Sequence, residues 1–220
     1  EWLHSWYHGV LGTNESLYAW MDEGFTSYAE DRVTAFLENN PGFAYQGAYN
    51  GYTALAKSGK EEPLTTHADH FNTNYAYGIA SYSKGEVFME QLGYITGAAT
   101  RDKILLNYYK LWRFKHPGIN DFMRVAEKTS GIQLDWYKEY WVNGTKTIDY
   151  VIDSLWEEGG KTKIRISRAG MMPMPVDAQI TFRDGSKELH YIPLNLMYGE
   201  KQVEDIDIPR KTYDPWRWTH

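Results

Sequence analysis

Three features are scarce or absent in this 220-residue sequence, and each absence excludes a class of protein. There is no cysteine, so disulfides, thiolate catalysis and cysteine-based zinc sites are excluded. No apolar run approaches the ~18 residues that a membrane-spanning helix needs. An excess of positive charge is also absent, since 29 acidic residues outnumber 23 Lys and Arg and the formal net charge is -6, and this argues against a nucleic-acid binder.

Aromatic residues are abundant instead, at 16% of the chain, with 9 tryptophans and 18 tyrosines. This composition predicts a core, or a groove, that is built from large rings. The 42% of hydrophobic residues is ordinary for a globular protein, and the length suits one large or two small domains.

The pattern along the chain changes near residue 146. Before that point apolar residues recur three and four apart, which predicts helices. After it, β-branched runs flank Gly159-Gly160 and then Gly185, which predicts two hairpins. The sequence therefore predicts an α+β chain, with a mostly helical domain over 1–145 and a truncated, β-rich, sandwich-like domain over 146–220. The expected helices cover 18–40, 44–60, 75–97 (with an end near either Gly93 or Gly97), 101–114, 121–131 and 133–144.

The chain opens with Glu1-Trp2-Leu3-His4, which is either an ordinary helical turn or the last four residues of H-E-x-x-H. The pair E-x-x-H alone occurs by chance in many chains. In a zinc site, a histidine one turn before His4 would share its helix face, so both imidazoles could bind one zinc ion. Glu1 could then act as the general base on a zinc-bound water molecule. Glu23, after eighteen intervening residues, is the candidate third ligand.

Further blocks make the zinc-site interpretation specific. The stretch W-M-D-E-G-F (20–25) is similar to W-L-N-E-G-F, a motif of one family of zinc peptidases. The stretch Y-S-K-G (82–85) matches a Y-x-K-G motif that follows in the same family some sixty residues later. The stretch 115–141 resembles the end of the same catalytic domain, and the loop 9–14 resembles that of a bacterial subgroup. Together these blocks resemble the aminopeptidase N family of zinc metallopeptidases, the gluzincins.

This resemblance implies a thermolysin-like helical subdomain followed by a sandwich domain. It implies a zinc aminopeptidase that removes N-terminal residues from peptide substrates and holds one zinc ion in the parent protein. His4 and Glu23 would be zinc ligands, and Glu1 would polarise the attacking water. Tyr82 would donate a hydrogen bond to the oxyanion of the reaction, a contribution of about 10²–10³ in rate.

Several other polar residues have weaker assignments. The resemblance implies Tyr77 as a second family tyrosine, and we expect Tyr77 and Asp22 at the substrate cleft. Asp22 could also support a zinc ligand. We expect His67 and His70, in a polar loop, at the surface or the edge of the cleft, and His8 in a structural role.

Two family elements do not occur in the sequence: the first histidine of H-E-x-x-H and an upstream G-x-M-E-N, whose glutamate binds the substrate's amine. We therefore expect a fragment that begins inside the motif and that alone binds zinc weakly, with weak or no activity. The alternative is a non-catalytic binding or scaffold domain of the same fold, and the residue preceding Glu1 would separate the two. Side-chain specificity and oligomeric state stay open, while a secreted, periplasmic or cell-envelope location is favoured over the cytoplasm.

Overall fold

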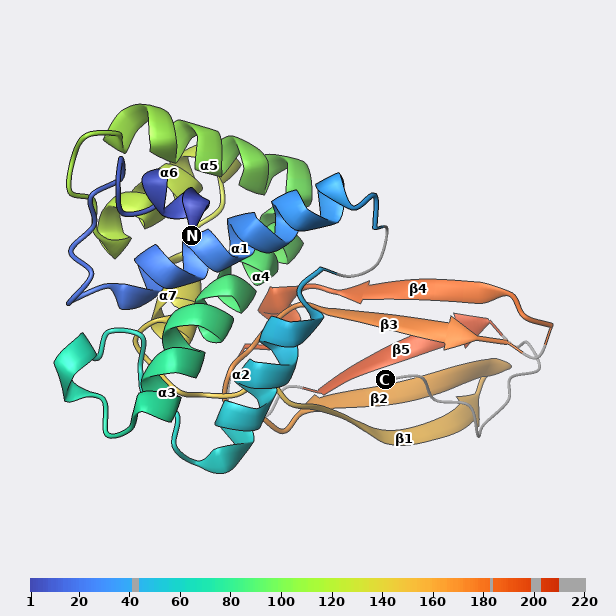
Figure 1. The fold of residues 1–220 in the computed structure, drawn as a ribbon. Helices are drawn as coiled ribbons and strands as arrows, with labels where there is room; N and C mark the ends of the chain where they lie inside the picture. Colours follow the sequence, from blue (N-terminus) through green and yellow to red (C-terminus); the bar gives the residue numbers. More distant parts are fainter. Residues whose placement is uncertain (41–43, 183, 199–202, 210–220) are drawn as a thin grey trace. The chain divides into compact units, whose positions relative to one another are not determined.

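The computed structural model describes residues 1–40, 44–182, 184–198 and 203–209 (Figure 1). The chain divides into two compact units, Glu1–Thr145 and Lys146–His220, and each is described by itself. Within the described ranges, every helix is too short or too polar to span a bilayer. Residues 210–220, at the end of the predicted β-rich domain, lie outside the described residues.

The first unit is helical, as the periodicity predicted, and each expected helix is present within a few residues of its predicted bounds. Its elements are η1 (Trp2–Ser5), α1 (Ala19–Leu37), α2 (Gln46–Ser58), η2 (Ala68–His70), α3 (Asn74–Gly78), η3 (Ile79–Lys84), α4 (Gly85–Thr96), α5 (Ala98–Trp112), α6 (Ile119–Ser130) and α7 (Asp135–Trp141).

The segment expected as one helix over 75–97 is helical throughout but not regular, because its middle part, η3, is a π-helix. The hydroxyl of Thr73 caps the start by accepting a hydrogen bond from the Ala76 amide at 3.1 Å. Gly97, with φ +87°, ends α4. The sequence predicted one long helix here but not its π turn, since a wider turn leaves no mark in a three-and-four apolar spacing. Such π turns are frequent at functional sites.

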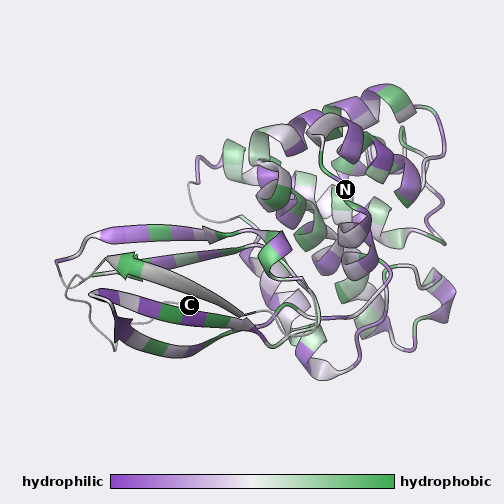
Figure 2. Ribbon diagram, turned by 180° about the vertical axis from the view of Figure 1, so that it is seen from behind, coloured by the Kyte–Doolittle hydropathy of each residue, from purple (hydrophilic) through white to green (hydrophobic). Residues whose placement is uncertain are grey.

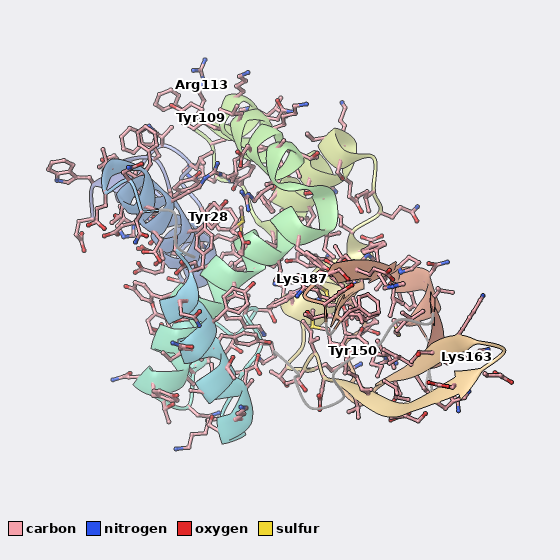
Figure 3. The ribbon with its side chains drawn as sticks, turned by 90° about the vertical axis from the view of Figure 1, so that its right-hand side faces the viewer. Tyr28, Tyr109, Arg113, Tyr150, Lys163 and Lys187 are labelled. Atoms are coloured by element: carbon pink, nitrogen blue, oxygen red, sulfur yellow. The ribbon has the colours of Figure 1, made fainter. Side chains whose placement is uncertain are left out.

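Aromatic rings fill the interior of this unit, as the composition predicted. Trp20 and Phe25 of α1 meet edge to face at 5.7 Å, and Trp20 meets Phe88 of α4 at 4.9 Å. Phe122 of α6 then contacts Phe25 at 5.0 Å and Tyr108 of α5 at 5.1 Å. One network of aromatic contacts thus ties four helices together. Figure 3 shows the side chains of this unit as sticks.

Two glycines bring α1 directly against the start of α4. A Cβ atom built on Gly24 would lie 2.6 Å from the Cα of Gly85, and one on Gly85 would lie 3.0 Å from the Trp20 carbonyl. Only residues without a side chain allow this approach. The contact positions η3, which immediately precedes Gly85, beside the face of α1 that carries Asp22 and Glu23.

The second unit contains both predicted hairpins. β1 (Tyr150–Glu158) pairs with β2 (Lys161–Arg168) around Gly159 and Gly160, both with positive φ, and β3 (Val176–Thr181) pairs with β4 (Lys187–Ile192). The strand β5 (Val203–Pro209), which the sequence analysis did not predict, adds to β2, and η4 (Leu194–Leu196) follows β4.

Alternating side chains of the two sheets share one apolar core, which contains Ile164 and Ile166 of β2 and Ile192 of β4. Figure 2 shows the corresponding stripes of hydrophobic and hydrophilic residues along the strands. Tyr150 ties β1 to the segment before β3, because its hydroxyl both donates to and accepts from the backbone of Met174 at 2.7 Å. This is the sandwich-like arrangement that the sequence predicted.

Candidate active site

The loop between η1 and α1 brings the two predicted zinc ligands together. Nε2 of His4 lies 3.5 Å from Oε2 of Glu23. The chain reverses at Gly9, whose amide donates to the His4 carbonyl at 2.9 Å. A Cβ at Gly9 would lie 2.7 Å from the Ser5 carbonyl, so the turn requires glycine. A helix, a glycine-bearing loop and a second helix thus produce the contact that the eighteen-residue spacing predicted.

Asp22 orients the imidazole of His4. Its Oδ1 lies 2.8 Å from His4 Nδ1, and the Thr26 hydroxyl lies 3.4 Å from the same nitrogen. With the Nδ1 proton held by this carboxylate, Nε2 presents its lone pair towards Glu23. Burial raises the pKa of Asp22, and the hydrogen bond to His4 opposes the rise. A histidine held by a carboxylate at one nitrogen is the usual support of a metal-binding imidazole.

Tyr82 lies on the π-helical segment η3, near enough to Glu23 for the two side chains to interact. Partial burial, then the interaction with the Glu23 carboxylate and its charge, raise the pKa of Tyr82 well above its usual range. The phenol therefore stays protonated at neutral pH and is able to donate. The two predicted residues from distant parts of the chain meet at one place.

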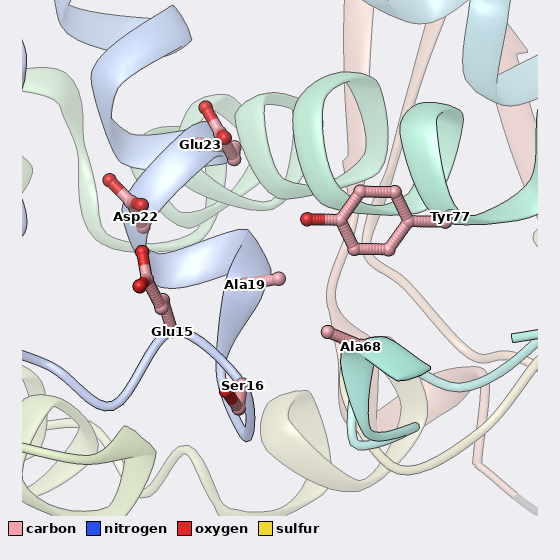
Figure 4. A pocket seen from close by; sticks show the side chains of 7 residues that line it. All are labelled: Glu15, Ser16, Ala19, Asp22, Glu23, Ala68 and Tyr77. Atoms are coloured by element: carbon pink, nitrogen blue, oxygen red, sulfur yellow. The ribbon is translucent and has the colours of Figure 1, made fainter. Parts of the chain in front are cut away.

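A pocket of about 210 Å³ adjoins these residues, with Tyr77 opposite the carboxylates of α1 (Figure 4). Burial, and then the negative charges of Glu23, Asp22 and Glu15, raise the pKa of Tyr77. The cleft positions predicted for Tyr77 and Asp22 are both on its wall. The full lining is Glu15, Ser16, Ala19, Asp22, Glu23, Ala68 and Tyr77.

The sequence analysis missed two parts of this wall. Glu15 and Ser16 precede α1, and the Ser16 carbonyl accepts from the Ala68 amide at 2.9 Å, which fixes η2 beside the loop. The rings of His67 and His70 flank this contact, with 4.9 Å between their centres. No motif marks Glu15; its only signal is its place in the loop that returns to Glu23.

We expected His8 in a structural role, and this stays a prediction. It is partly exposed, its Nδ1 lies 3.2 Å from the Thr13 carbonyl, and its Nε2 lies 3.4 Å from Oε2 of Glu15. One ligand atom each from His8, Glu15 and Asp22 lies within 4.8 Å of the other two. The sequence analysis did not predict the approach of His8 to Glu15, because this depends on the loop that returns Glu15 to His8.

Glu1 precedes η1 with a fully exposed side chain, and its carbonyl accepts from the His4 amide at 3.2 Å. Its amino group lies 3.6 Å from Oε2 of Glu30. The predicted role of Glu1 as general base stays a prediction.

Lys84, the lysine of the Y-S-K-G block, fixes the position of η3 next to the site. It is buried, and its ammonium lies 2.7 Å from Oε1 of Glu61 and 3.1 Å from the Gly144 carbonyl. Burial lowers the pKa of Lys84, and the charge of Glu61 opposes this change. The pair holds η3 against the loop that follows α2, which helps to place Tyr82.

The fold and this arrangement define a class of protein: a helical hydrolase-type scaffold in which an oriented histidine, a glutamate and a tyrosine converge beside an acidic pocket. The comparisons with known proteins agree. Residues 1–141 match the peptidase family M1 domain. The chain therefore belongs to peptidase family M1, and the resemblance to the aminopeptidase N family is confirmed.

Relatives of known name are much longer than this chain. Leucine aminopeptidase 2 of Neosartorya fischeri is 26% identical over 202 residues, which are 80% of this chain and 32% of that protein. The structure of Legionella pneumophila aminopeptidase A with aspartic acid covers 100% of this chain and 26% of its own, at 12% identity and a TM-score of 0.61. An M1 zinc metallopeptidase of Deinococcus radiodurans covers 66% and 32%, at 19% identity and a TM-score of 0.54. These structures support the fold, and the chain spans about a third or less of these proteins.

Proposed function

We propose that this chain carries part of the active site of a zinc-dependent aminopeptidase, with His4 and Glu23 as zinc ligands. The observation that carries the proposal is the 3.5 Å between His4 Nε2 and Glu23 Oε2, with His4 oriented by Asp22. Two ligands that bind one tetrahedral zinc ion at about 2.0–2.1 Å are roughly 3.4 Å apart. The residues therefore fit the metal, and a mixed imidazole and carboxylate set is the type that zinc hydrolases use.

When bound, zinc polarises the scissile carbonyl and lowers the pKa of water to about 7. Tyr82, kept protonated beside Glu23, would donate a hydrogen bond to the oxygen that gains negative charge as the peptide carbonyl is attacked. Glu1 would take a proton from the attacking water and return it to the leaving amine. The acidic pocket beside Tyr77 suits a positively charged group, such as the ammonium group of a peptide's first residue.

We also propose that these 220 residues, tested alone, bind zinc weakly and have weak or no activity. Among the residues that the structure describes, no third histidine, aspartate or glutamate atom joins His4 and Glu23 in one cluster. Loss of even a supporting contact around a metal ligand typically costs 10–100-fold in affinity or activity. The alternative, a non-catalytic scaffold of the same fold, is less favoured because His4, Asp22, Glu23 and Tyr82 converge as a hydrolase needs.

The test is metal analysis and hydrolysis of an aminoacyl anilide by the complete protein that carries this sequence. Tyr82→Phe should lower kcat by about 10²–10³ and leave the zinc content unchanged. Tyr75→Phe is the matched control, since Tyr75 lies on the same helical segment with similar exposure, 47% against 44%. Full turnover after removal of zinc, or equal activity of both variants, would contradict the mechanism. Absence of both zinc and turnover in the complete protein would support the scaffold alternative.

A further inference from the structure

His8 has no role in the function proposed above, but it forms a group with Glu15 and Asp22, two of the residues that line the pocket. His8 and Glu15 belong to the loop between η1 and α1, and Asp22 lies in the first turn of α1. Figure 4 shows the carboxylates of Glu15 and Asp22 close together on one side of the pocket. The third member, His8, directs Nε2 at Oε2 of Glu15 from 3.4 Å.

These distances suit a transition-metal ion. Nitrogen and oxygen ligands bind zinc at about 2.0–2.2 Å, so two ligands of one tetrahedral ion are roughly 3.4 Å apart. The pair His8–Glu15 already has this separation, and no pair of ligand atoms in the group exceeds 4.8 Å. The Glu15 side chain is 61% exposed, so a small rotation can close the remaining gap.

The orientation of His8 adds an independent reason. Nδ1 faces the Thr13 carbonyl at 3.2 Å, and because a carbonyl only accepts, Nδ1 carries the proton. Nε2 then directs its lone pair at a carboxylate oxygen, which is repulsive unless a cation lies between them. A proton would satisfy two acceptors, but Asp22 brings a third acceptor to the same place, and three converging acceptors suit a metal ion.

His4 provides an internal comparison. It also has one ring nitrogen held by an oxygen and the other facing a glutamate, at 2.8 and 3.5 Å, against 3.2 and 3.4 Å for His8. Asp22 belongs to both arrangements. In both histidines, one ring nitrogen is therefore held by an oxygen and the other is free to bind a metal ion next to a glutamate.

We propose that His8, Glu15 and Asp22 form a second binding site for a divalent transition-metal ion such as Zn²⁺, next to the His4–Glu23 pair. An imidazole with two carboxylates favours zinc or cobalt over calcium or magnesium. Because Asp22 also orients His4, an ion in the second site competes with His4 for this carboxylate. The second site therefore weakens the first when the metal concentration is high.

The experiment is titration of the complete, metal-free protein with Zn²⁺ by calorimetry, and with Co²⁺ by visible absorption. We expect two classes of site, of which His8→Ala or Glu15→Gln weakens the lower-affinity one at least tenfold and leaves the other in place. His67→Ala is the matched control, since His67 also has a nearby carboxylate, Asp69 at 3.8 Å, outside the group. The exposed Glu15 makes Glu15→Gln safe for folding if His8→Ala fails to fold.

Asp22→Asn separates the two sites, because an amide oxygen can still accept from His4 Nδ1 while the charge at the second site is lost. We expect it to weaken the second site much more than the first. A single bound ion at saturation, or two classes of site that persist in His8→Ala and Glu15→Gln, would overturn the proposal. If His4→Ala leaves all binding unchanged while His8→Ala removes it, the proposed function fails and the second site stands.

Discussion

The close contact between Gly24 and Gly85 leads to a sharp prediction about the substitution Gly24→Ala. The new Cβ would lie 2.6 Å from the Cα and 2.8 Å from the carbonyl carbon of Gly85, and 2.8 Å from the Ser81 carbonyl oxygen. All three are backbone atoms, so no side chain can rotate out of the way. Ordinary contact begins near 3.4 Å, so α1 and the η3–α4 segment must separate by about 0.8 Å.

We expect two effects from this displacement. Overpacking of this kind typically costs about 1–3 kcal/mol, and the higher helix propensity of alanine returns roughly 0.4–1 kcal/mol. The net loss of unfolding free energy should lie between about 0 and 2.6 kcal/mol, with a middle value of ~1.3 kcal/mol. Since Tyr82 lies on η3 and Glu23 precedes Gly24, the shift also separates these two side chains, and a displacement near 1 Å can cost ~10² in rate.

Urea unfolding followed by circular dichroism measures the first effect, and anilide hydrolysis the second. The control is Gly78→Ala, at a helical position of the same segment where a Cβ would meet nothing within 4 Å and φ is −61°. This variant should be unchanged or stabilised by about 0.4–1 kcal/mol. If Gly24→Ala is as stable as Gly78→Ala, the reasoning about the close contact is wrong.

Three further predictions concern buried polar groups. Asp22→Ala should weaken zinc binding by about 10–100-fold, because it removes the carboxylate that orients His4. The zinc affinity is measured with a competing chelator. If Asp22→Ala weakens zinc binding no more than Asp22→Asn does, Asp22 does not orient His4. Burial, then the hydrogen bond to Asp31 and the charges of Asp31 and Glu30, raise the pKa of Glu86 to about 9 from 4.5, so its stabilising contribution is complete below pH 4.5 and is lost as pH rises towards 9. Glu86→Gln should therefore raise the unfolding free energy by on the order of 2 kcal/mol at pH 9 and change it little at pH 5, and equal effects at both pH values would contradict this assignment. Glu61→Gln should cost about 3–5 kcal/mol in urea unfolding, because it leaves the Lys84 ammonium buried without its partner, and a neutral result would mean that Lys84 is uncharged.

The sequence alone was enough to predict the residues that share a motif. The spacing of His4, Glu23 and Tyr82 indicated the family, and the structure brings these three side chains together. The hairpins were predictable because glycines stand between β-branched runs. In the structure Gly159, Gly160 and Gly185 have positive φ in the turns, which glycine adopts readily. Such signals are local, since each depends on the conformational preferences of a few neighbouring residues or on a fixed offset along the chain.

The tertiary structure decided what the local pattern could not express. The π turn at η3, the approach of Gly24 to Gly85 and the meeting of His8 with Glu15 each depend on which segments pack against each other. The role of Asp22 towards His4 likewise became visible only when the loop had returned α1 to η1. Distances between side chains are set by the packing of whole helices, and no spacing along the sequence determines them.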